Sequence, residues 1–136
     1  MSGRAGLSVD SNSGIDALYL AWRDAFRRGD IDAILGLLTP DYVLWAPGKP
    51  AIGFAELRPL LLAAVEAYEI DSTFECEERI VSGDLAVERG WDVQTIKPRG
   101  GGPVQVQRQR IFVVLRRTPE GAWRFARGIS QPGPVA

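Results

Sequence analysis

The absence of histidine limits the chemistry that this sequence can perform. Histidine is the usual general base near neutral pH and a common zinc ligand, so histidine-based triads and histidine-ligated zinc are excluded. Cys76 is the single cysteine, which excludes an internal disulfide and a thiolate-rich metal site. Its apolar strand neighbours favour a buried, unreactive thiol. The sequence therefore predicts no cofactor and no metal, and any catalysis must use the remaining polar side chains.

The charge balance of the chain disfavours nucleic acid and membranes as partners. Sixteen basic and seventeen acidic side chains leave a formal charge of −1. Six arginines on the last predicted strands can pair across the sheet with glutamates: Arg108, Arg110, Arg116, Arg117, Arg124 and Arg127 with Glu75, Glu77, Glu78 and Glu88. The first ten residues lack a secretory signal, and no apolar run has the length of a membrane span. A cytoplasmic location is expected.

The elements that must position these side chains begin with helices. We expect a disordered tail over residues 1–13, one domain over 14–131 and a second tail over 132–136. Apolar residues at helical spacing predict a first helix from Ser13 to Gly29 and a second from Asp30, as cap, to Leu38.

A third helix is expected over about residues 54–68, with a kink or a later start at Pro59. A short strand over 41–46 precedes it. Beyond the third helix the apolar period changes to two, which predicts four further strands: about residues 74–80, 85–93, 104–117 and 123–129. The fold class is therefore α+β, with three helices packed on a curved, mainly antiparallel sheet that leaves a tapered hollow.

Several local motifs together resemble a known superfamily. They are residues 25–33, Asp41, residues 47–50, Gly53, residues 81–86, Gly90 and residues 120–124. The chain resembles the small SnoaL-like and ketosteroid isomerase-like proteins of the nuclear transport factor 2-like superfamily, from about Ile15 to Gln131. The resemblance implies a cone-shaped, cystatin-like fold. The motifs specify turns, caps and close packing rather than a reaction.

Ketosteroid isomerase is the sharpest functional comparison that the resemblance offers. Its family uses a carboxylate base at the end of the first strand and a tyrosine on the first helix. The corresponding positions here hold Ala46 and Trp22, and a second oxyanion donor maps near Phe112 or Val113. None of these side chains can perform the family's chemistry, so that mechanism is disfavoured.

The epoxide-hydrolase members of the superfamily suggest another carboxylate and arginine set. The candidates here are Asp92 with Arg108 or Arg110, and Glu88 on the same strand face as Asp92. If this face points into the cone, Asp92 and Glu88 are acids of the pocket. If it points outward, they form a row that faces solvent or a dimer partner. The opposite face carries large apolar residues, so the usual behaviour of half-buried strands favours the outward placement.

Aromatic residues near the expected mouth of the cone suggest a pocket, although such residues also serve as core. The candidate lining residues are Trp22, Tyr42, Trp45, Ala46 and Tyr68. The leading hypothesis is a domain that binds a small apolar or aromatic molecule. The alternatives are an isomerase, cyclase or hydrolase with Asp92 or Glu88 as general base, and a non-catalytic interaction module. A homodimer is expected because apolar residues such as Phe112 and Val113 occur on both faces of the same strand.

Overall fold

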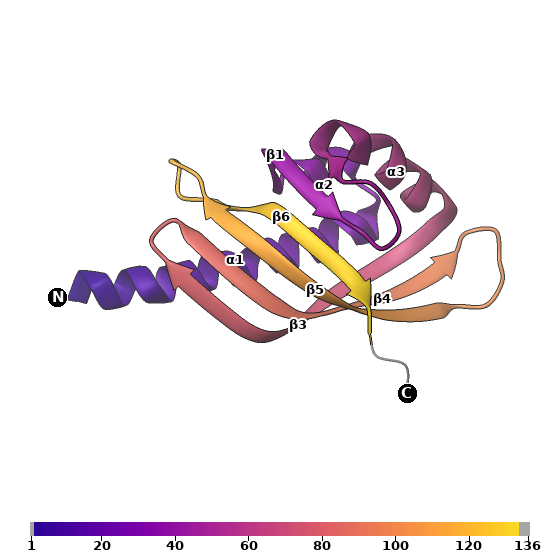
Figure 1. Ribbon diagram of the computed structural model, residues 1–136. Coiled ribbons are helices and arrows are strands. Elements are labelled where there is room, and N and C mark those ends of the chain that lie inside the picture. Colours follow the sequence, from indigo (N-terminus) through magenta and orange to yellow (C-terminus); the bar gives the residue numbers. More distant parts are fainter. Residues whose placement is uncertain (1, 134–136) are drawn as a thin grey trace.

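The computed structural model describes residues 2–133, with side chains from Ser11 onward. Within this range it contains three helices and six strands (Figure 1). In chain order they are α1 (Ser2–Arg28), α2 (Ile31–Leu35), β1 (Leu38–Trp45), β2 (Ile52–Gly53), α3 (Phe54–Ala67), β3 (Tyr68–Ser82), β4 (Leu85–Pro98), β5 (Gln105–Arg117) and β6 (Trp123–Pro132).

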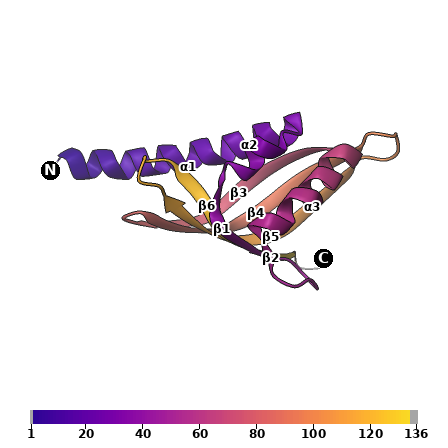
Figure 2. The ribbon, with the colours of Figure 1, turned by 90° about the horizontal axis from the view of Figure 1, so that it is seen from above.

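The strands form one curled sheet in the order β2-β1-β6-β5-β4-β3. All neighbouring pairs are antiparallel except β1 and β6, which are parallel. Helix α1 lies across the sheet, with contacts to β3 and β6 (Figure 2). Helix α3 contacts β1 near one edge of the sheet and β3 at the other, so it closes the open side of the curl. The predicted α+β class and mainly antiparallel sheet are confirmed.

The first helix is longer than the sequence predicts. We expected disorder up to residue 13, but α1 begins at Ser2, while Met1 lies outside the described residues. The helical turn around Gly14 packs against the rest of the domain. A Cβ at Gly14 would lie 2.9 Å from the Trp123 ring, and the Asn12 carbonyl accepts a hydrogen bond from Arg79. Once a turn is fixed, each added helical residue gains a hydrogen bond at low cost. At the other end, β6 includes Pro132, and residues 134–136 lie outside the described part.

The second helix is shorter than predicted. Asp30 caps it as expected, since its carboxylate accepts from the Ala33 amide at 3.0 Å after Gly29 has taken a φ of +65°. The helix ends at Leu35, however, and Leu38 already belongs to β1. Strand pairing decides this boundary, because Leu38 pairs with a residue of β6. Propensity alone could not show that contact.

The strand before the third helix belongs to a hairpin that the sequence did not indicate. Strand β2, Ile52–Gly53, pairs with Val43 and Leu44 of β1. Helix α3 then starts at Phe54 and contains Pro59, so the later start that we considered is not observed.

Burial along β4 settles which face of this strand points inward. Ala86 and Glu88 are buried, whereas Leu85 is exposed. The face that carries Asp92 therefore points toward α1, and the outward placement favoured from the sequence is wrong. Because both faces carry apolar groups, strand parity could not choose between them. The small Ala86 and Gly90 leave room for close packing on the inner side.

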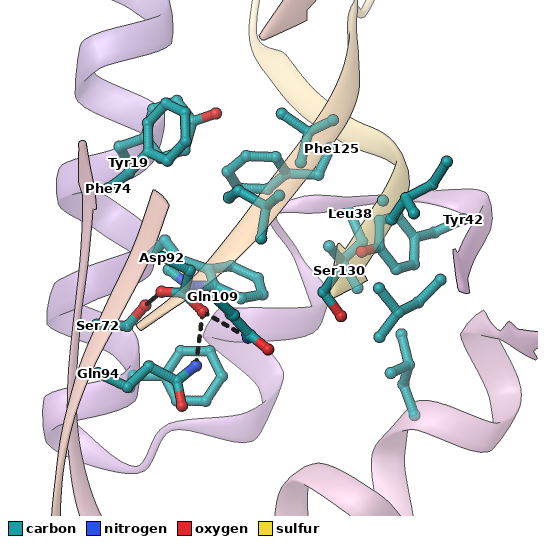
Figure 3. A pocket seen from close by; sticks show the side chains of 18 of the residues that line it. Tyr19, Leu38, Tyr42, Ser72, Phe74, Asp92, Gln94, Gln109, Phe125 and Ser130 are labelled. Carbon is teal, nitrogen blue, oxygen red and sulfur yellow. Dashed lines mark hydrogen bonds between the residues drawn. The ribbon is translucent and has the colours of Figure 1, made fainter. Parts of the chain in front are cut away.

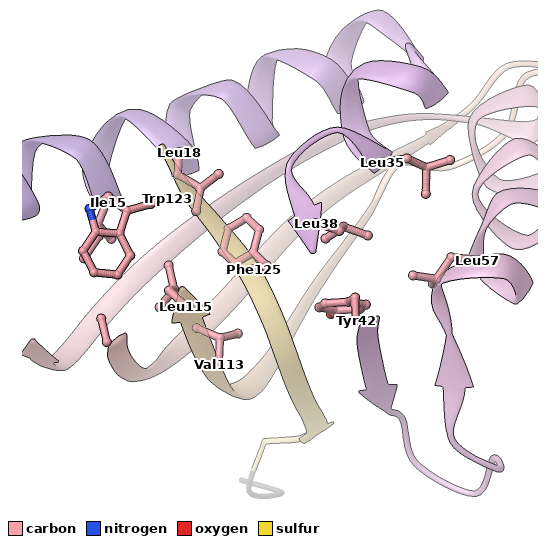
Figure 4. Close-up of a cluster of buried hydrophobic side chains, with 11 residues drawn as sticks. Ile15, Leu18, Leu35, Leu38, Tyr42, Leu57, Val113, Leu115, Trp123 and Phe125 are labelled. Carbon is pink, nitrogen blue, oxygen red and sulfur yellow. The ribbon is translucent and has the colours of Figure 1, made fainter. Parts of the chain in front are cut away.

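The main core lies between α1 and the inner face of the sheet. Its buried members come from every layer, as Figure 4 shows: Ile15, Leu18, Leu35, Leu38, Tyr42, Leu57, Ala86, Val113, Leu115, Trp123 and Phe125. A smaller cluster of Ala25, Phe26, Ile34, Val65 and Ile70 joins α1, α2 and α3 to β3. Among the described residues, no helix combines the length and apolar character needed to cross a membrane.

Candidate functional site

A cavity of about 240 Å³ lies on the inner side of the sheet, bounded by α1, α3 and the strands (Figure 3). Most of its wall is apolar. The apolar lining comes from Trp22, Phe26, Leu38, Leu44, Leu57, Leu61, Phe74, Ile111, Val113 and Phe125, together with the rings of Tyr19 and Tyr42. One end is polar and contains Ser72, Asp92, Gln94, Gln109 and Ser130. An apolar wall with a few convergent polar groups is typical of small-molecule sites.

Asp92 is the centre of the polar end. Its Oδ1 accepts a hydrogen bond from the Ser72 hydroxyl at 2.8 Å. Its Oδ2 accepts from Gln94 Nε2 at 2.8 Å and from Gln109 Nε2 at 3.1 Å. Figure 3 shows these side chains converging from neighbouring strands. Three neutral donors thus hold one carboxylate in a fixed orientation at the cavity wall.

Strand register brings this cluster together. Ser72 of β3 pairs with Gln94 of β4, and Asp92 of β4 pairs with Gln109 of β5. The tight turn between β3 and β4, with Gly83 at a φ of +59°, and the irregularity between Cys76 and Glu78 together set this register. Since side chains two positions apart on a strand share a face, a slip of one residue would turn Asp92 and its partners outward.

Aromatic contacts hold the wall on the side of α1. The Tyr19 ring stacks on the Phe74 ring with 4.5 Å between centroids, and it meets the Phe125 ring edge-on at 5.2 Å. Trp22 meets the same Phe125 ring at 5.2 Å and tilts against Phe26 at 4.8 Å. Such pairs restrict ring motion. Trp22, a predicted pocket residue, therefore forms a well-supported part of the cavity wall.

Tyr42, another predicted pocket residue, closes the side next to β6. Burial raises the pKa of its hydroxyl to about 12, so the group stays protonated at neutral pH. The hydroxyl lies close to the backbone of Gly128, where a Cβ would come within 2.7 Å of the oxygen. Glycine at this position is therefore required by the tyrosine.

Glu88, a candidate general base, does not line this cavity. Its side chain is buried under α1, with 1% of the residue exposed. Glu88 Oε1 accepts from Arg79 Nε at 2.8 Å, and Arg79 Nη2 in turn donates to Asp16 at 2.8 Å. Burial raises the pKa of Glu88, and Arg79 opposes that rise. Within residues 11–133, Glu88 Oε2 and the Tyr19 hydroxyl have no hydrogen-bond partner, and burial strongly raises the pKa of Tyr19.

Three predicted pocket residues lie elsewhere. Trp45, at the end of β1, is 59% exposed, and Tyr68, at the junction of α3 and β3, is also exposed. Ala46 follows β1 and is not part of the cavity wall. The sequence analysis expects these residues at the mouth of the cone, but Trp45 and Tyr68 are exposed to solvent and none of the three lines the cavity.

The predicted arginines lie on the outer face of the sheet. Arg110 and Arg108 lie over the Trp91 ring, 5.4 and 4.5 Å from its centre, and Arg108 also pairs with Glu75. Arg108 and Arg110 lie on the opposite face of β5 from Gln109, so neither reaches Asp92. Cys76 is exposed rather than buried, next to an irregularity in the pairing of β3 with β4.

The polar partners of Asp92 were not predicted as site residues. Gln94 shares the strand face of Asp92 because it lies two residues further along β4. The sequence did not indicate Ser72 or Gln109, nor Ser130, which lines the polar end of the cavity. Strand parity could have identified Gln109 once the direction of the Asp92 face was known. Ser72 required the register of β3, which depends on the turn and the irregularity near Cys76.

Comparison with known families gives one match. A family model described as a SnoaL-like domain matches residues 19–125. No curated protein matches the chain in sequence. The matched segment includes Asp92, all its hydrogen-bonding partners and Trp22.

Solved structures share the architecture over most of their length. A ketosteroid isomerase-like protein from Erwinia carotovora atroseptica is 30% identical, with a TM-score of 0.73 and coverage of 90% of this chain and 96% of that one. A conserved protein from Planctomyces limnophilus is 24% identical, with a TM-score of 0.83 and coverage of 90% and 98%. A nuclear transport factor 2-like protein with a cystatin-like fold from Novosphingobium aromaticivorans is 21% identical, with a TM-score of 0.79 and coverage of 99% and 89%.

Proposed function

The chain belongs to the SnoaL-like branch of the nuclear transport factor 2-like superfamily, and on this basis we propose that it binds a small, mostly apolar, ring-shaped molecule in the inner cavity. The observation that carries the proposal is a cavity of about 240 Å³ with an apolar wall and a polar end built around Asp92. This volume lies below the range of about 300–1,000 Å³ usual for drug-sized ligands, so the ligand is of the size of a single substituted ring.

A second proposal is that the cavity also performs proton transfer. Asp92 is the only carboxylate among the residues that line it, which supports Asp92 as the general base of an isomerase, cyclase or hydrolase. Glu88 is withdrawn as an alternative base because Arg79 pairs with it beneath α1. The comparison with ketosteroid isomerase expects the base at the position that Ala46 occupies here, so Asp92 would act from a different position.

We also propose that the chain forms a homodimer through the outer face of the sheet. Phe112 of β5 and Ile129 of β6 pair with each other and are 43% and 42% exposed. Ile129 also pairs with the exposed Trp45 of β1, so three large apolar side chains form a row across adjacent strands. Exposed apolar rows of this kind are typical of protein contacts.

Filling the cavity tests the binding proposal. Leu61 on α3 lines the cavity, whereas the next residue, Leu62, is exposed and does not. The variant Leu61→Trp should abolish binding of a small aromatic probe, followed by tryptophan fluorescence or calorimetry, and Leu62→Trp should leave it unchanged. Thermal unfolding of both variants reports whether the fold is retained. Equal binding by the two folded variants would contradict the proposal.

A further inference from the structure

The charge at the polar end of the cavity restricts which ligand would fit there. All three hydrogen bonds at Asp92 are donated to its carboxyl oxygens, as expected for a carboxylate, which only accepts. Of the residues that line the cavity, none is a lysine or arginine, and none of the ion pairs among the described residues includes Asp92. The partners of Asp92 are a hydroxyl and two amides, all of them neutral. Within the described part of the chain, the Asp92 carboxylate at the polar end of the cavity therefore has no cationic partner.

Two arginines near the cavity, Arg23 and Arg79, already have anionic partners. Arg23 on α1 donates twice to Asp71, at 2.7 and 3.0 Å. Arg79 pairs with Glu88 and Asp16. Neither guanidinium is available to Asp92 without breaking these pairs.

The hydrogen bonds around Asp92 leave mostly acceptors free. A carboxylate accepts only, so Gln94 and Gln109 must turn their amide nitrogens toward Asp92 and their oxygens away. Figure 3 shows the nitrogens of both amides directed at Asp92, with the oxygens on the opposite side. Neither amide oxygen accepts a hydrogen bond from another described residue. With about four acceptor positions on a carboxylate and three in use, Asp92 also keeps one free.

The neighbouring wall suits a cationic group attached to an apolar ring. Phe74 of β3 pairs with Asp92 of β4, and its ring lines the cavity together with Trp22. Aromatic faces attract ammonium groups, and an apolar, partly enclosed site strengthens the attraction between opposite charges compared with water.

We propose that the cavity selects a small ring-containing amine, whose ammonium group donates a hydrogen bond to the free acceptor position of Asp92. This inference rests on the proposed binding function and specifies its ligand class. An ammonium group supplies hydrogen-bond donors and one positive charge, and Asp92 offers a free acceptor position and the opposite charge. A carboxylate or phosphate ligand would instead meet the charge of Asp92.

Three probes of nearly equal size test the inference with the full chain. They are benzylamine, benzyl alcohol and benzoate, which differ at the polar end in charge and donors. We expect benzylamine to bind about tenfold more tightly than benzyl alcohol, because charge-assisted hydrogen bonds are stronger than neutral ones, and benzoate to bind weakest. Calorimetry or tryptophan fluorescence at neutral pH measures the order.

An Asp92→Asn variant should bind benzylamine and benzyl alcohol with similar affinity. Asp84→Asn serves as the control, since it removes one negative charge from the exposed turn before β4, where Asp84 pairs with Arg117. If Asp92→Asn does not fold, the order of the three probes on the unchanged chain still decides. Equal binding of the probes, or a preference for the alcohol or benzoate, would overturn the inference but leave the binding function intact. Failure of all three probes to bind would count against the binding function itself.

Discussion

The Ser72 hydroxyl donates a hydrogen bond of 2.8 Å to Asp92 Oδ1 and so links β3 to β4 at the polar end of the cavity. Ser72 is buried, and it lies in the strand that α1 covers. The bond therefore has two effects. It stabilises the sheet, and it fixes the direction in which the carboxylate presents its free acceptor position.

Replacing Ser72 with alanine should weaken this arrangement. We expect the free energy of unfolding to fall by about 1 kcal/mol, the usual net contribution of one hydrogen bond, with a further loss if Asp92 finds no new donor. Urea denaturation measures the change. The matched control is Ser82→Ala at the exposed end of the same strand. If both variants lose the same stability, the bond to Asp92 contributes nothing specific.

Removing Arg79 should be more damaging than removing Ser72. Arg79→Met leaves the buried Glu88 carboxylate without a cation, and breaking a buried ion pair from one side costs about 3–5 kcal/mol. The double variant Arg79→Met with Glu88→Leu should recover part of this loss, since it also removes the unpaired charge. Chemical denaturation of the two variants provides the comparison. A double variant that is no more stable than Arg79→Met would contradict the unpaired Glu88 charge as the cause of the loss.

The pH dependence of stability should report Glu88 directly. Burial raises the pKa of Glu88 above its ordinary value of 4.5, so the folded state holds this proton more tightly than the unfolded state does. The contribution of this proton to the free energy of unfolding is present in full below the ordinary pKa, and it is lost as pH rises through the raised pKa of the folded state. In Arg79→Met the opposing cation is gone, so the loss should extend to higher pH. Melting temperatures over about pH 4 to pH 8 measure this, and Glu88→Gln should remove the dependence.

Gly128 and Tyr42 should show coupled effects. A Cβ at position 128 would lie 2.7 Å from the Tyr42 oxygen and 3.3 Å from a methyl carbon of Leu44. Gly128→Ala should therefore destabilise the fold by about 1–3 kcal/mol, as overpacking usually does. In a background of Tyr42→Phe, which lacks the oxygen, the same substitution should cost less. A double-mutant cycle measures the coupling, and additive costs would contradict the contact.

The proposed dimer makes a prediction on the outer face. Phe112→Asp should convert a dimer into a monomer, measured by light scattering after size exclusion, because it places a charge at one end of the apolar row. Leu20→Asp is the control, since Leu20 is an exposed apolar residue on α1 instead of the sheet. Val113 is unsuitable for this test because it is buried in the core. An unchanged elution volume and mass for Phe112→Asp would contradict a dimer through this face.

Much of the fold could be predicted from the sequence because local signals agreed with one another. The cap at Asp30, the positive φ at Gly29, Gly83 and Gly121, and the span of α3 all depend on residues close in the chain. The packing of α1 at Gly14 and the early start of β1 at Leu38 depend instead on partners far away, Trp123 and Phe125.

The site was harder to predict than the fold for the same reason. Trp22, Tyr42 and Asp92 were identified as candidates from their types and positions. Their common environment depends on which face of β4 the helices cover, and apolar residues on both faces of that strand hide the answer. The hydrogen-bonding partners of Asp92 come from three strands, so only the register reveals them.

Nuclear magnetic resonance of the side-chain amides of Gln94 and Gln109 tests the central claim most directly. These two amides hold Asp92 at the polar end of the cavity, and Trp22 borders the apolar wall. During titration with benzylamine, the account predicts saturable shifts of both amide signals and of the Trp22 indole, with the outer-face indoles of Trp45 and Trp91 unchanged. Shifts confined to Trp45 and Trp91, or no shifts at saturating probe, would contradict it.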